Sequence, residues 1–306
     1  MPSPDPAGAP ASPAASEVDF DLQAHSLHSD GALPAAEVVE RAAAAGVRLL
    51  ALTDHDTVEG VEEALAAGAR RGIAVVPATE LSAVDEQNED LHVLGYRIEH
   101  RDPGLLEALA DFRSDRRVRA QAMADALEGL GWSVDRQALA RAARAGGDRP
   151  VGRPHLAAAV AEHPANRERM RAEGLDEPSR LLEAYLIPGA PAYRPRTRPT
   201  VAEAIELIAA AGGIAVWAHP FWDIDDTGEV RARLERFCDW GLRGVEAFYP
   251  THSAEQTRAL CEEARRLDLL TTGSSDFHAP GHRLFDGFLA FSLYGCQPRL
   301  GPIAAG

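Results

Sequence analysis

The chain repeats one pattern through most of its length: a short apolar run with strand character, followed by an amphipathic stretch with helical character. The apolar runs are VDFDLQA, RLLALTDHD, IAVVPATELSA, DLHVLGYRI, IAVWAHP, GVEAFYP and LLTTGSSDFH. Apolar strands between amphipathic helices predict a parallel sheet that helices cover on both faces. This many units favour an α/β fold in which the strands form a closed or nearly closed barrel, with an open doubly wound sheet as the alternative.

One segment interrupts this alternation. Residues 99–199 contain helical patterns such as DPGLLEALADFRSDRRVRAQAMADALEGLG and DRQALARAARAG, and they end in the proline-rich IPGAPAYRPRTRP. We therefore expect a helical insertion domain at 99–199 within a discontinuous barrel made of residues 18–98 and 200–295. Residues 1–17 are rich in Pro, Ala and Ser, which predicts a disordered tail.

The composition of the chain restricts the classes of molecule that it can bind. The 306 residues carry a net charge of −16, and such an acidic surface repels long duplex nucleic acid and anionic membranes. The acidic net charge still allows a small phosphorylated ligand to bind in a locally basic pocket, since arginines concentrate in the helical segment. Three cysteines without metal spacing, together with no signal-peptide pattern, predict a cytoplasmic protein with reduced thiols. The oligomeric state does not follow from the sequence.

Nearly every predicted strand ends in side chains that can bind a metal ion. In chain order these are His25, His28 and Asp30; Asp54, His55 and Asp56; Glu80; His92; His219; Glu246 and His252; and Asp276 and His278. In a barrel of this kind the carboxyl ends of the strands meet on one face. So many imidazoles and carboxylates on one rim would repel and desolvate one another without a cation, although a single histidine at a strand end is more often structural.

The ligand types narrow the choice of metal. Nitrogen and oxygen donors without thiolate suit Zn²⁺, Mn²⁺ or Fe²⁺, with Mn²⁺ favoured and Mg²⁺ also compatible. The donors outnumber those that one ion needs, which predicts a cluster of two or three divalent ions. Such clusters activate water, polarise a phosphoryl oxygen and stabilise a leaving oxygen.

The ordered set DLQAHSLHSDG, TDHD, PATELSA, LHVLGY, AHP and GSSDFH resembles the PHP (polymerase and histidinol phosphatase) family over residues 18–290. The resemblance implies a distorted seven-stranded (β/α) barrel with a helical insertion, holding up to three metal ions and acting as a phosphoesterase. The motifs GRPHLA and PGAPAYRP are similar to those of the branch that acts on nucleoside 3′,5′-bisphosphates, some members of which trim short RNAs from the 5′ end.

The resemblance also implies the ligand sets. By position, His25, Glu80 and Asp276 match a first metal site, and Glu80 bridges to a second site completed by His92 and His219. The third site matches Asp30, His55 and His278. The family opens with His-x-His, and Gln23 replaces the first of these histidines, so we expect a weakened first site to which Gln23 contributes a neutral amide oxygen or a bound water.

Further residues are candidates for catalysis or substrate binding. Asp276 is a candidate catalytic residue, and His252 is a candidate for phosphate contact or for protonating the leaving group. The candidates for substrate binding are Arg153, His155, Arg194, Arg196 and His28. For the arginines the alternative is a solvated basic face, and for His28 it is the cap of a turn. Tyr193 either stacks on a base or packs in the core.

Three functions remain open at this stage. The first is a metal-dependent phosphatase that removes a terminal phosphate from a small nucleotide such as a nucleoside 3′,5′-bisphosphate, and that also trims short RNA ends. The second is a histidinol-phosphatase-like monoesterase. The third is a barrel that binds nucleotide or metal without turnover, which only Gln23 favours.

Overall fold

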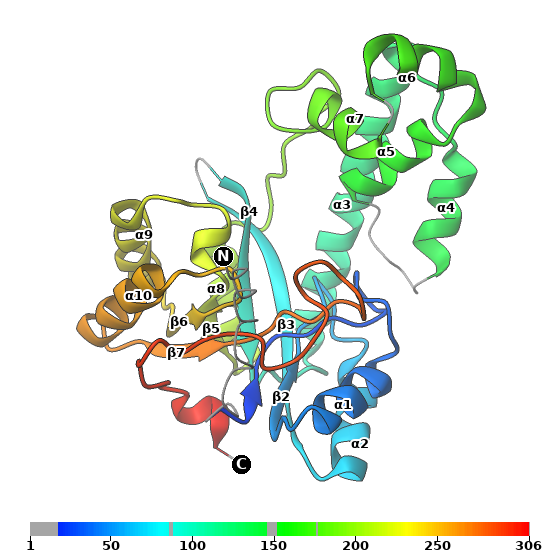
Figure 1. Cartoon of the computed structure of the whole chain (residues 1–306). Coiled ribbons are helices and arrows are strands. Elements are labelled where there is room, and N and C mark those ends of the chain that lie inside the picture. The colour runs from blue at the N-terminus through cyan, green and yellow to red at the C-terminus, as the bar shows by residue number, and fades with distance from the viewer. Residues whose placement is uncertain (1–17, 86–87, 146–151, 176, 306) are drawn as a thin grey trace, which may run out of the picture.

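The computed structural model describes residues 18–85, 88–145, 152–175 and 177–305 (Figure 1). The predicted tail at 1–17 lies outside the described residues. None of the helices in the described part of the chain is both long enough and apolar enough to cross a membrane.

A single seven-stranded sheet forms the barrel, and its strands follow one another in chain order from β1 to β7. The strands are β1 (Phe20–Asp21), β2 (Leu49–Leu52), β3 (Ala74–Asp85), β4 (Asn88–Tyr96), β5 (Ile214–Trp217), β6 (Gly244–Phe248) and β7 (Leu270–Gly273). Two hydrogen bonds join the first and last strands and the segments that follow them. Leu22 N–H donates to the Gly273 carbonyl at 3.1 Å, and His25 N–H donates to the Phe277 carbonyl at 2.8 Å. The predicted distorted seven-stranded barrel is thereby confirmed, and it is nearly closed.

The prediction of a parallel sheet is wrong for one strand. β4 runs antiparallel to both β3 and β5, whereas the other neighbours pair in parallel. Only two residues separate β3 from β4, and a parallel crossover needs a connection of a dozen or more residues. The reversal places the first half of β4 at the same rim as the carboxyl end of β3, where His92 pairs with Ser82.

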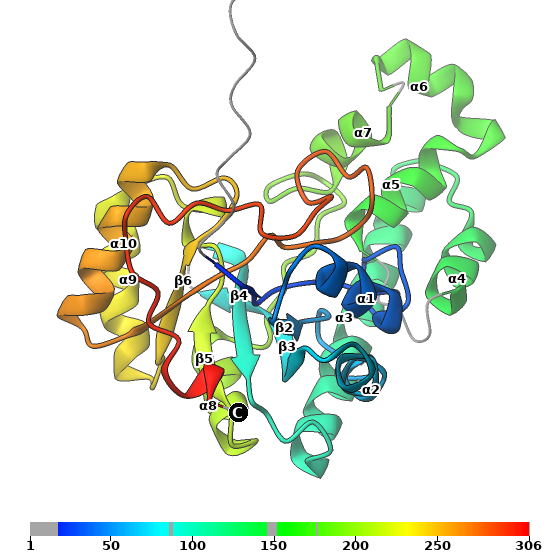
Figure 2. The same ribbon diagram turned by 60° about the horizontal axis from the view of Figure 1, so that its bottom comes forward.

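Among the described residues, five α-helices cover the outside of the barrel: α1 (Ala35–Ala44), α2 (Val61–Arg71), α8 (Val201–Ala210), α9 (Thr227–Asp239) and α10 (Ala254–Arg266). Figure 2 shows α9 and α10 on one side of the sheet and α1 and α2 on the other. Their buried faces repeat at helical spacing, as in Val38, Val39 and Ala42 of α1. A capping box fixes the start of α8, since Thr200 and Glu203 exchange hydrogen bonds between side chain and backbone N–H.

The remaining helices form a unit that projects from the barrel (Figure 1). They are α3 (Pro103–Gly129), α4 (Arg136–Ala145), α5 (Arg153–Ala161), α6 (Arg167–Glu173) and α7 (Pro178–Tyr185). This unit has its own hydrophobic cluster, which includes Leu127, Leu156 and Leu181. α3 belongs to both parts, because Leu105 and Leu109 near its start pack in the barrel core.

Candidate metal centre and active site

Glu80 lies at the centre of the rim with its side chain fully buried. One of its oxygens, Oε1, lies 2.8 Å from His92 Nδ1 and 3.2 Å from His219 Nε2. The other oxygen, Oε2, accepts a hydrogen bond from Gln23 Nε2 at 2.9 Å and lies 3.2 Å from His25 Nε2. The two oxygens of one carboxylate thus face two different groups of nitrogen donors.

His25 connects Glu80 to the carboxyl end of β7. Its Nε2 lies 3.0 Å from Asp276 Oδ1, and its ring stacks between the rings of His55 and His278 at centroid distances of 4.6 and 4.3 Å. Parallel pairing of Ala24 with Phe277 brings these two strand ends together. The stack therefore joins three histidines that are distant in sequence.

Asp30 closes the other side of this group. Its carboxylate oxygens lie 3.6 Å from His25 Nδ1, 3.6 Å from His55 Nε2 and 3.5 Å from His278 Nε2. The turn that returns Asp30 to the rim depends on Gly31, because a Cβ at this position would lie 2.3 Å from the His25 carbonyl oxygen.

These donors fit divalent metal ions. One atom from each of His25, Asp30, His55 and His278 lies within 4.8 Å of the others, and the same holds for His55, Glu80 and His92. Three buried polar atoms in the described part of the rim have no hydrogen-bond partner, namely Gln23 Oε1, His55 Nδ1 and His219 Nδ1. A buried polar atom without a partner costs free energy, which coordination of a cation removes.

The protonation states differ between the groups of the rim. Burial by itself lowers the pKa of His25, but the neighbouring Asp276 and Glu80 carboxylates hold it well above its ordinary value. Burial by itself raises the pKa of the Glu80 carboxyl, but the surrounding His55, His92 and His219 hold it well below its ordinary range. Burial lowers the pKa of His55 to about 4, so this imidazole is neutral at pH 7 and keeps a lone pair for a metal ion.

Two further carboxylates, Asp54 and Glu246, hold the backbone segments of the rim in place by hydrogen bonds. Asp54 accepts hydrogen bonds from Ser26 N–H at 2.7 Å and from Ser29 Oγ at 2.6 Å, which fixes the loop after β1. Glu246 accepts from His219 N–H at 3.0 Å and from Ser274 Oγ at 2.6 Å, and burial raises the pKa of its carboxyl well above the usual range. Glu246 thus holds the backbone that carries His219.

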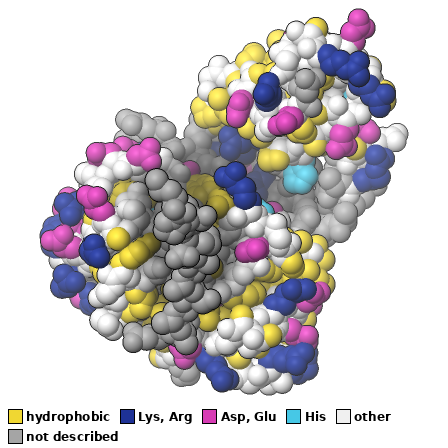
Figure 3. Space-filling view, viewed as in Figure 1, with side chains coloured by type: hydrophobic (Ala, Val, Ile, Leu, Met, Phe, Trp, Pro, Cys, Tyr) yellow, Lys and Arg dark blue, Asp and Glu magenta, His cyan; other side chains and the backbone are white. Residues whose placement is uncertain are grey.

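A cavity of about 440 Å³ opens beside the cluster, between the barrel and the helical unit. Its lining consists of Ser29, Asp30, His55, Ser82, His92, Arg116, Arg119, Gly152, Arg153, Pro154, His155 and Arg196. In the space-filling view, basic side chains and a histidine gather at this junction (Figure 3). The cavity therefore combines three metal-competent residues with four arginines in a chain that is acidic overall.

Two of these arginines are held in place by the barrel. Arg116 Nη1 lies 3.1 Å from Asp56 Oδ2, and Arg196 Nη1 donates to the Ser82 carbonyl at 2.8 Å. Asp56 comes from the TDHD motif, so the loop after β2 orients both the metal cluster and an arginine of α3. Sequence reasoning did not select Arg116 and Arg119, and their spacing of one helical turn was the available signal.

Three predicted residues lie elsewhere. His28 Nδ1 lies 3.6 Å from Glu59 Oε2, Arg194 donates to the Tyr193 carbonyl, and neither lines the cavity. His252 is buried beside Tyr249, at a ring distance of 5.3 Å, and its Nε2 has no hydrogen-bond partner. Burial lowers the pKa of His252 to about 4.

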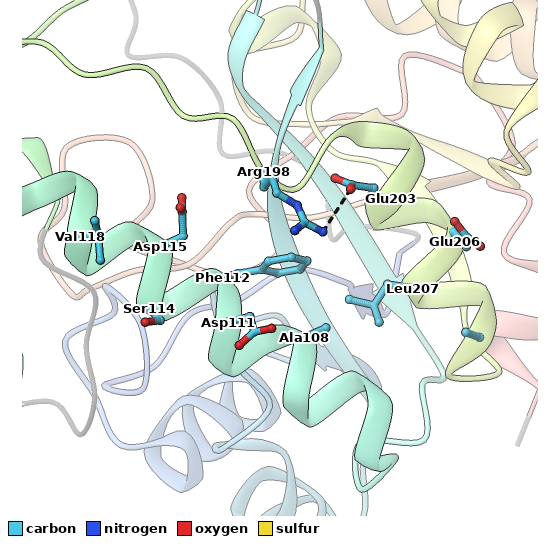
Figure 4. A pocket seen from close by; sticks show the side chains of 11 residues that line it. Ala108, Asp111, Phe112, Ser114, Asp115, Val118, Arg198, Glu203, Glu206 and Leu207 are labelled. Atoms are coloured by element: carbon cyan, nitrogen blue, oxygen red, sulfur yellow. Dashed lines mark hydrogen bonds and ion pairs between the residues drawn. The ribbon is translucent and has the colours of Figure 1, made fainter.

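A larger cavity of about 640 Å³ lies between α3 and α8 (Figure 4). Acidic side chains surround an apolar floor formed by Phe112 and Leu207, and Arg198 pairs with Glu203 at 3.2 Å. None of its lining residues is a histidine, so the cavity beside the metal-competent cluster is the candidate active site.

Comparison with known proteins agrees with this geometry. Residues 21–214 match the PHP domain family. A 3′,5′-nucleoside bisphosphate phosphatase of Chromobacterium violaceum is 36% identical over 266 residues, which cover 86% of this chain and 88% of that protein. A 5′-3′ exoribonuclease of Haemophilus influenzae is 33% identical, covering 85% and 90% of the two chains. The solved structure of an amidohydrolase from Chromobacterium violaceum with bound sulfate superposes with a TM-score of 0.76 at 31% identity, covering 94% and 96%.

Proposed function

The chain belongs to the PHP domain family and is a metal-dependent phosphoesterase, and we propose that it removes a terminal phosphate from small nucleotides such as nucleoside 3′,5′-bisphosphates. The observation that carries this proposal is the arginine-lined cavity that shares Asp30, His55 and His92 with the metal-competent cluster. A substrate with a second phosphate can place one phosphate at the cluster and the other among the arginines.

We assign the cluster to two or three divalent ions, with Mn²⁺ favoured. Glu80 would bridge a first site, with Gln23, His25 and Asp276, and a second site, with His92 and His219. Asp30, His55 and His278 would hold a third. When bound, such ions lower the pKa of water and neutralise charge on a phosphoryl group.

The protein's own groups bind and orient the substrate. Arg153, Arg196 and His155 hold the phosphate that is not cleaved, and binding energy from that group supports the chemical step. Arg116 and Arg119 add positive charge to the same cavity. We retain Asp276 as the candidate catalytic carboxylate: Tyr249 Oη donates to its Oδ2 at 2.7 Å, and Oδ1 is the oxygen that would hold a metal ion.

We retain His252 as the candidate donor to the leaving oxygen. With a pKa of about 4 its ring is neutral at pH 7, so the negative charge of a bound substrate must raise this pKa before the ring carries a transferable proton. The assignment of His28 and Arg194 to substrate binding stays a prediction, and neither residue lines the cavity.

Trimming of short RNA from the 5′ end is the second candidate function. It is supported by the 33% identical exoribonuclease, which aligns over most of both chains. Both functions place a nucleotide phosphate at the same cluster. We also propose that the protein is cytoplasmic, which its three free cysteines support.

The test is release of phosphate from nucleoside bisphosphates, nucleoside monophosphates, histidinol phosphate and short 5′-phosphorylated RNA, each with Mn²⁺, Mg²⁺ or Zn²⁺. We expect the highest kcat/KM for bisphosphates with Mn²⁺. A preference for histidinol phosphate would support the monoesterase alternative, and absence of turnover with all three metals would support a binding module.

Matched arginine variants test the cavity. Arg196→Ala should reduce the preference for bisphosphates over monophosphates about tenfold or more, the scale of one lost charge-assisted contact. Arg194→Ala is the control, because Arg194 lies two residues away and does not line the cavity. An equal loss of preference in both variants would contradict the assignment of the cavity.

A further inference from the structure

The rim of the barrel on the β5 and β7 side carries a group of aromatic rings. Trp222 follows β5, Tyr249 follows β6, and His282 and Phe285 lie in the segment after β7. Ring centroids of Trp222 and Phe285 are 5.7 Å apart, those of Trp222 and Tyr249 are 6.3 Å apart, and those of His282 and Phe285 are 5.3 Å apart and nearly parallel. The rings of Trp222 and His282 are exposed, and the buried rings of Tyr249 and Phe285 pack against them. We call these four rings the aromatic rim.

The aromatic rim adjoins the metal-competent cluster at two places. The Trp222 ring lies 6.5 Å from that of His219, and the Phe285 and His282 rings lie 5.5 and 5.8 Å from that of His278. His219 and His278 belong to two different proposed metal sites. The arginine-lined cavity meets the cluster through other residues, namely Asp30, His55 and His92. The cluster thus has a cationic cavity and an aromatic surface on different flanks.

Trp222 is held in place and yet open to solvent. The rings of His219, Tyr249 and Phe285 lie against its ring, and its backbone N–H donates to the His219 carbonyl at 2.8 Å. The residue nevertheless is 48% exposed, whereas Trp132 and Trp217 are buried in cores. A large aromatic side chain that is ordered before binding loses little entropy when a flat ligand stacks on it.

The chemistry of the aromatic rim indicates which part of a nucleotide it can bind. Aromatic faces carry no formal charge for a phosphate, but they stack on any nucleobase, because every base has a π-face. A nucleotide whose phosphate lies at the cluster keeps its base within a short distance of the rim. We propose that the aromatic rim, with Trp222 as its main contact, binds the nucleobase of the substrate. This inference rests on the proposed function and adds to it a recognition site for the base.

Intrinsic fluorescence provides a test that does not depend on turnover. In the full-length protein, adenosine 5′-monophosphate should quench the fluorescence of Trp222, while ribose 5-phosphate, which lacks a base, should not. Trp222→Leu should abolish most of this quenching. The matched control is Trp240→Leu. Trp240 is also partly exposed, at 38%, but it follows the end of α9 and stacks on Phe237, outside the aromatic rim.

Binding and kinetics measure the size of the effect. Trp222→Leu should weaken nucleotide binding, measured by calorimetry, about 5- to 100-fold, the range found for loss of one base–aromatic stack. Binding of ribose 5-phosphate should stay within about twofold. Trp222→Phe should retain most of the affinity, since a phenyl ring still stacks, and circular dichroism of each variant checks folding.

Other outcomes overturn the inference. An equal loss of affinity for the nucleotide and for ribose 5-phosphate would mean that Trp222 supports the cluster and does not bind a base. Loss of base preference in Tyr193→Leu, with Trp222→Leu unaffected, would place the base at the helical insertion. If wild-type protein releases no phosphate from bisphosphates but nucleotides still quench Trp222, the proposed function fails and the base site stands.

Discussion

At the residue scale, Gln23 is the main departure from the family's opening motif. Its amide nitrogen donates to Glu80 Oε2 at 2.9 Å, and its Oε1 is buried without a hydrogen-bond partner. Gln23 and His25 are two residues apart in an extended segment, and both are buried at the rim. An amide oxygen is a weaker ligand than an imidazole for Mn²⁺ or Zn²⁺, so the first metal site should be the weakest of the cluster.

The first prediction follows from this difference. Gln23→His should tighten the weakest metal site by at least about tenfold, because a neutral imidazole replaces a neutral amide. Calorimetric titration of Mn²⁺ into metal-stripped wild-type and variant protein measures this directly. Equal affinities at every site in the two proteins would show that Gln23 is not a ligand.

The second prediction concerns Glu80. Glu80→Ala should remove more than one metal ion per chain and abolish turnover, because its two oxygens face separate groups of donors. Glu246→Gln is the matched control, since Glu246 is also a buried glutamate at the rim but receives hydrogen bonds from His219 N–H and Ser274. Elemental analysis should give wild-type metal content for the control. Unchanged content in Glu80→Ala would refute the bridging role.

The third prediction concerns pH and stability. Burial lowers the pKa of His252 from 6.5 to about 4, so the unfolded chain binds a proton that the folded protein does not bind between these values. Stability is therefore complete above the unfolded pKa and falls as the pH drops toward the folded pKa. Between about pH 7.5 and about pH 5, the protonation of this residue in the unfolded chain should lower the free energy of unfolding by about 2 kcal/mol.

The measurement compares wild type with His252→Asn, whose amide can replace the hydrogen bond from Nδ1 to the Ala247 carbonyl. Urea unfolding at both pH values should give a smaller pH dependence for the variant, by about 2 kcal/mol. Parallel pH profiles for the two proteins would mean that the ring is protonated inside the fold or is hydrated there.

At the scale of elements, α3 connects the two parts of the molecule. Leu109 packs in the barrel core and Leu127 packs in the cluster of the helical unit, and both side chains are essentially buried. Between them, Arg116 pairs with Asp56 of the loop after β2 at 3.1 Å. A single continuous helix thus sets the position of the arginine-lined cavity relative to the metal-competent cluster.

The fourth prediction uses these two leucines as a matched pair. Leu127→Ala and Leu109→Ala should each cost about 2–5 kcal/mol, the usual range for a buried leucine. Leu127→Ala should increase hydrogen exchange mainly in α4–α7 and leave metal affinity unchanged, whereas Leu109→Ala should also increase exchange in the barrel. Identical exchange patterns would mean that the two hydrophobic clusters unfold as one unit.

At the scale of the whole molecule, an acidic chain surrounds a basic cavity. The net charge is −16, yet four arginines and His155 line the cavity next to the cluster. We propose that residues 99–199 act as an insertion domain whose purpose is to deliver these cations to the barrel rim. A local field of this kind attracts small phosphorylated ligands, while the rest of the surface repels long polyanions.

Much of this protein follows from the sequence because local patterns are sufficient for it. Alternating strands and helices predict the barrel, and the donors at strand ends predict the metal-competent rim, since parallel strands bring their carboxyl ends to one face. Asp30 is an example, because the short SDG turn is enough to return it to His25, at 3.6 Å. The reversed direction of β4 could also be read from the short gap between the predicted strands IAVVPATELSA and DLHVLGYRI, since a parallel crossover needs a dozen or more residues.

Other features depend on contacts between residues that are distant in the sequence. No local pattern indicates that Arg116 of α3 pairs with Asp56, or that Trp222 packs against Tyr249 and Phe285. Nor does the sequence show that Arg196 lines the cavity and Arg194 does not. These positions result from how the helical unit and the loops pack on the barrel, which the periodicity of a single element does not encode. Local sequence patterns therefore specify the barrel and its metal-competent donors, whereas packing between distant segments places the arginines and aromatic rings around the candidate active site.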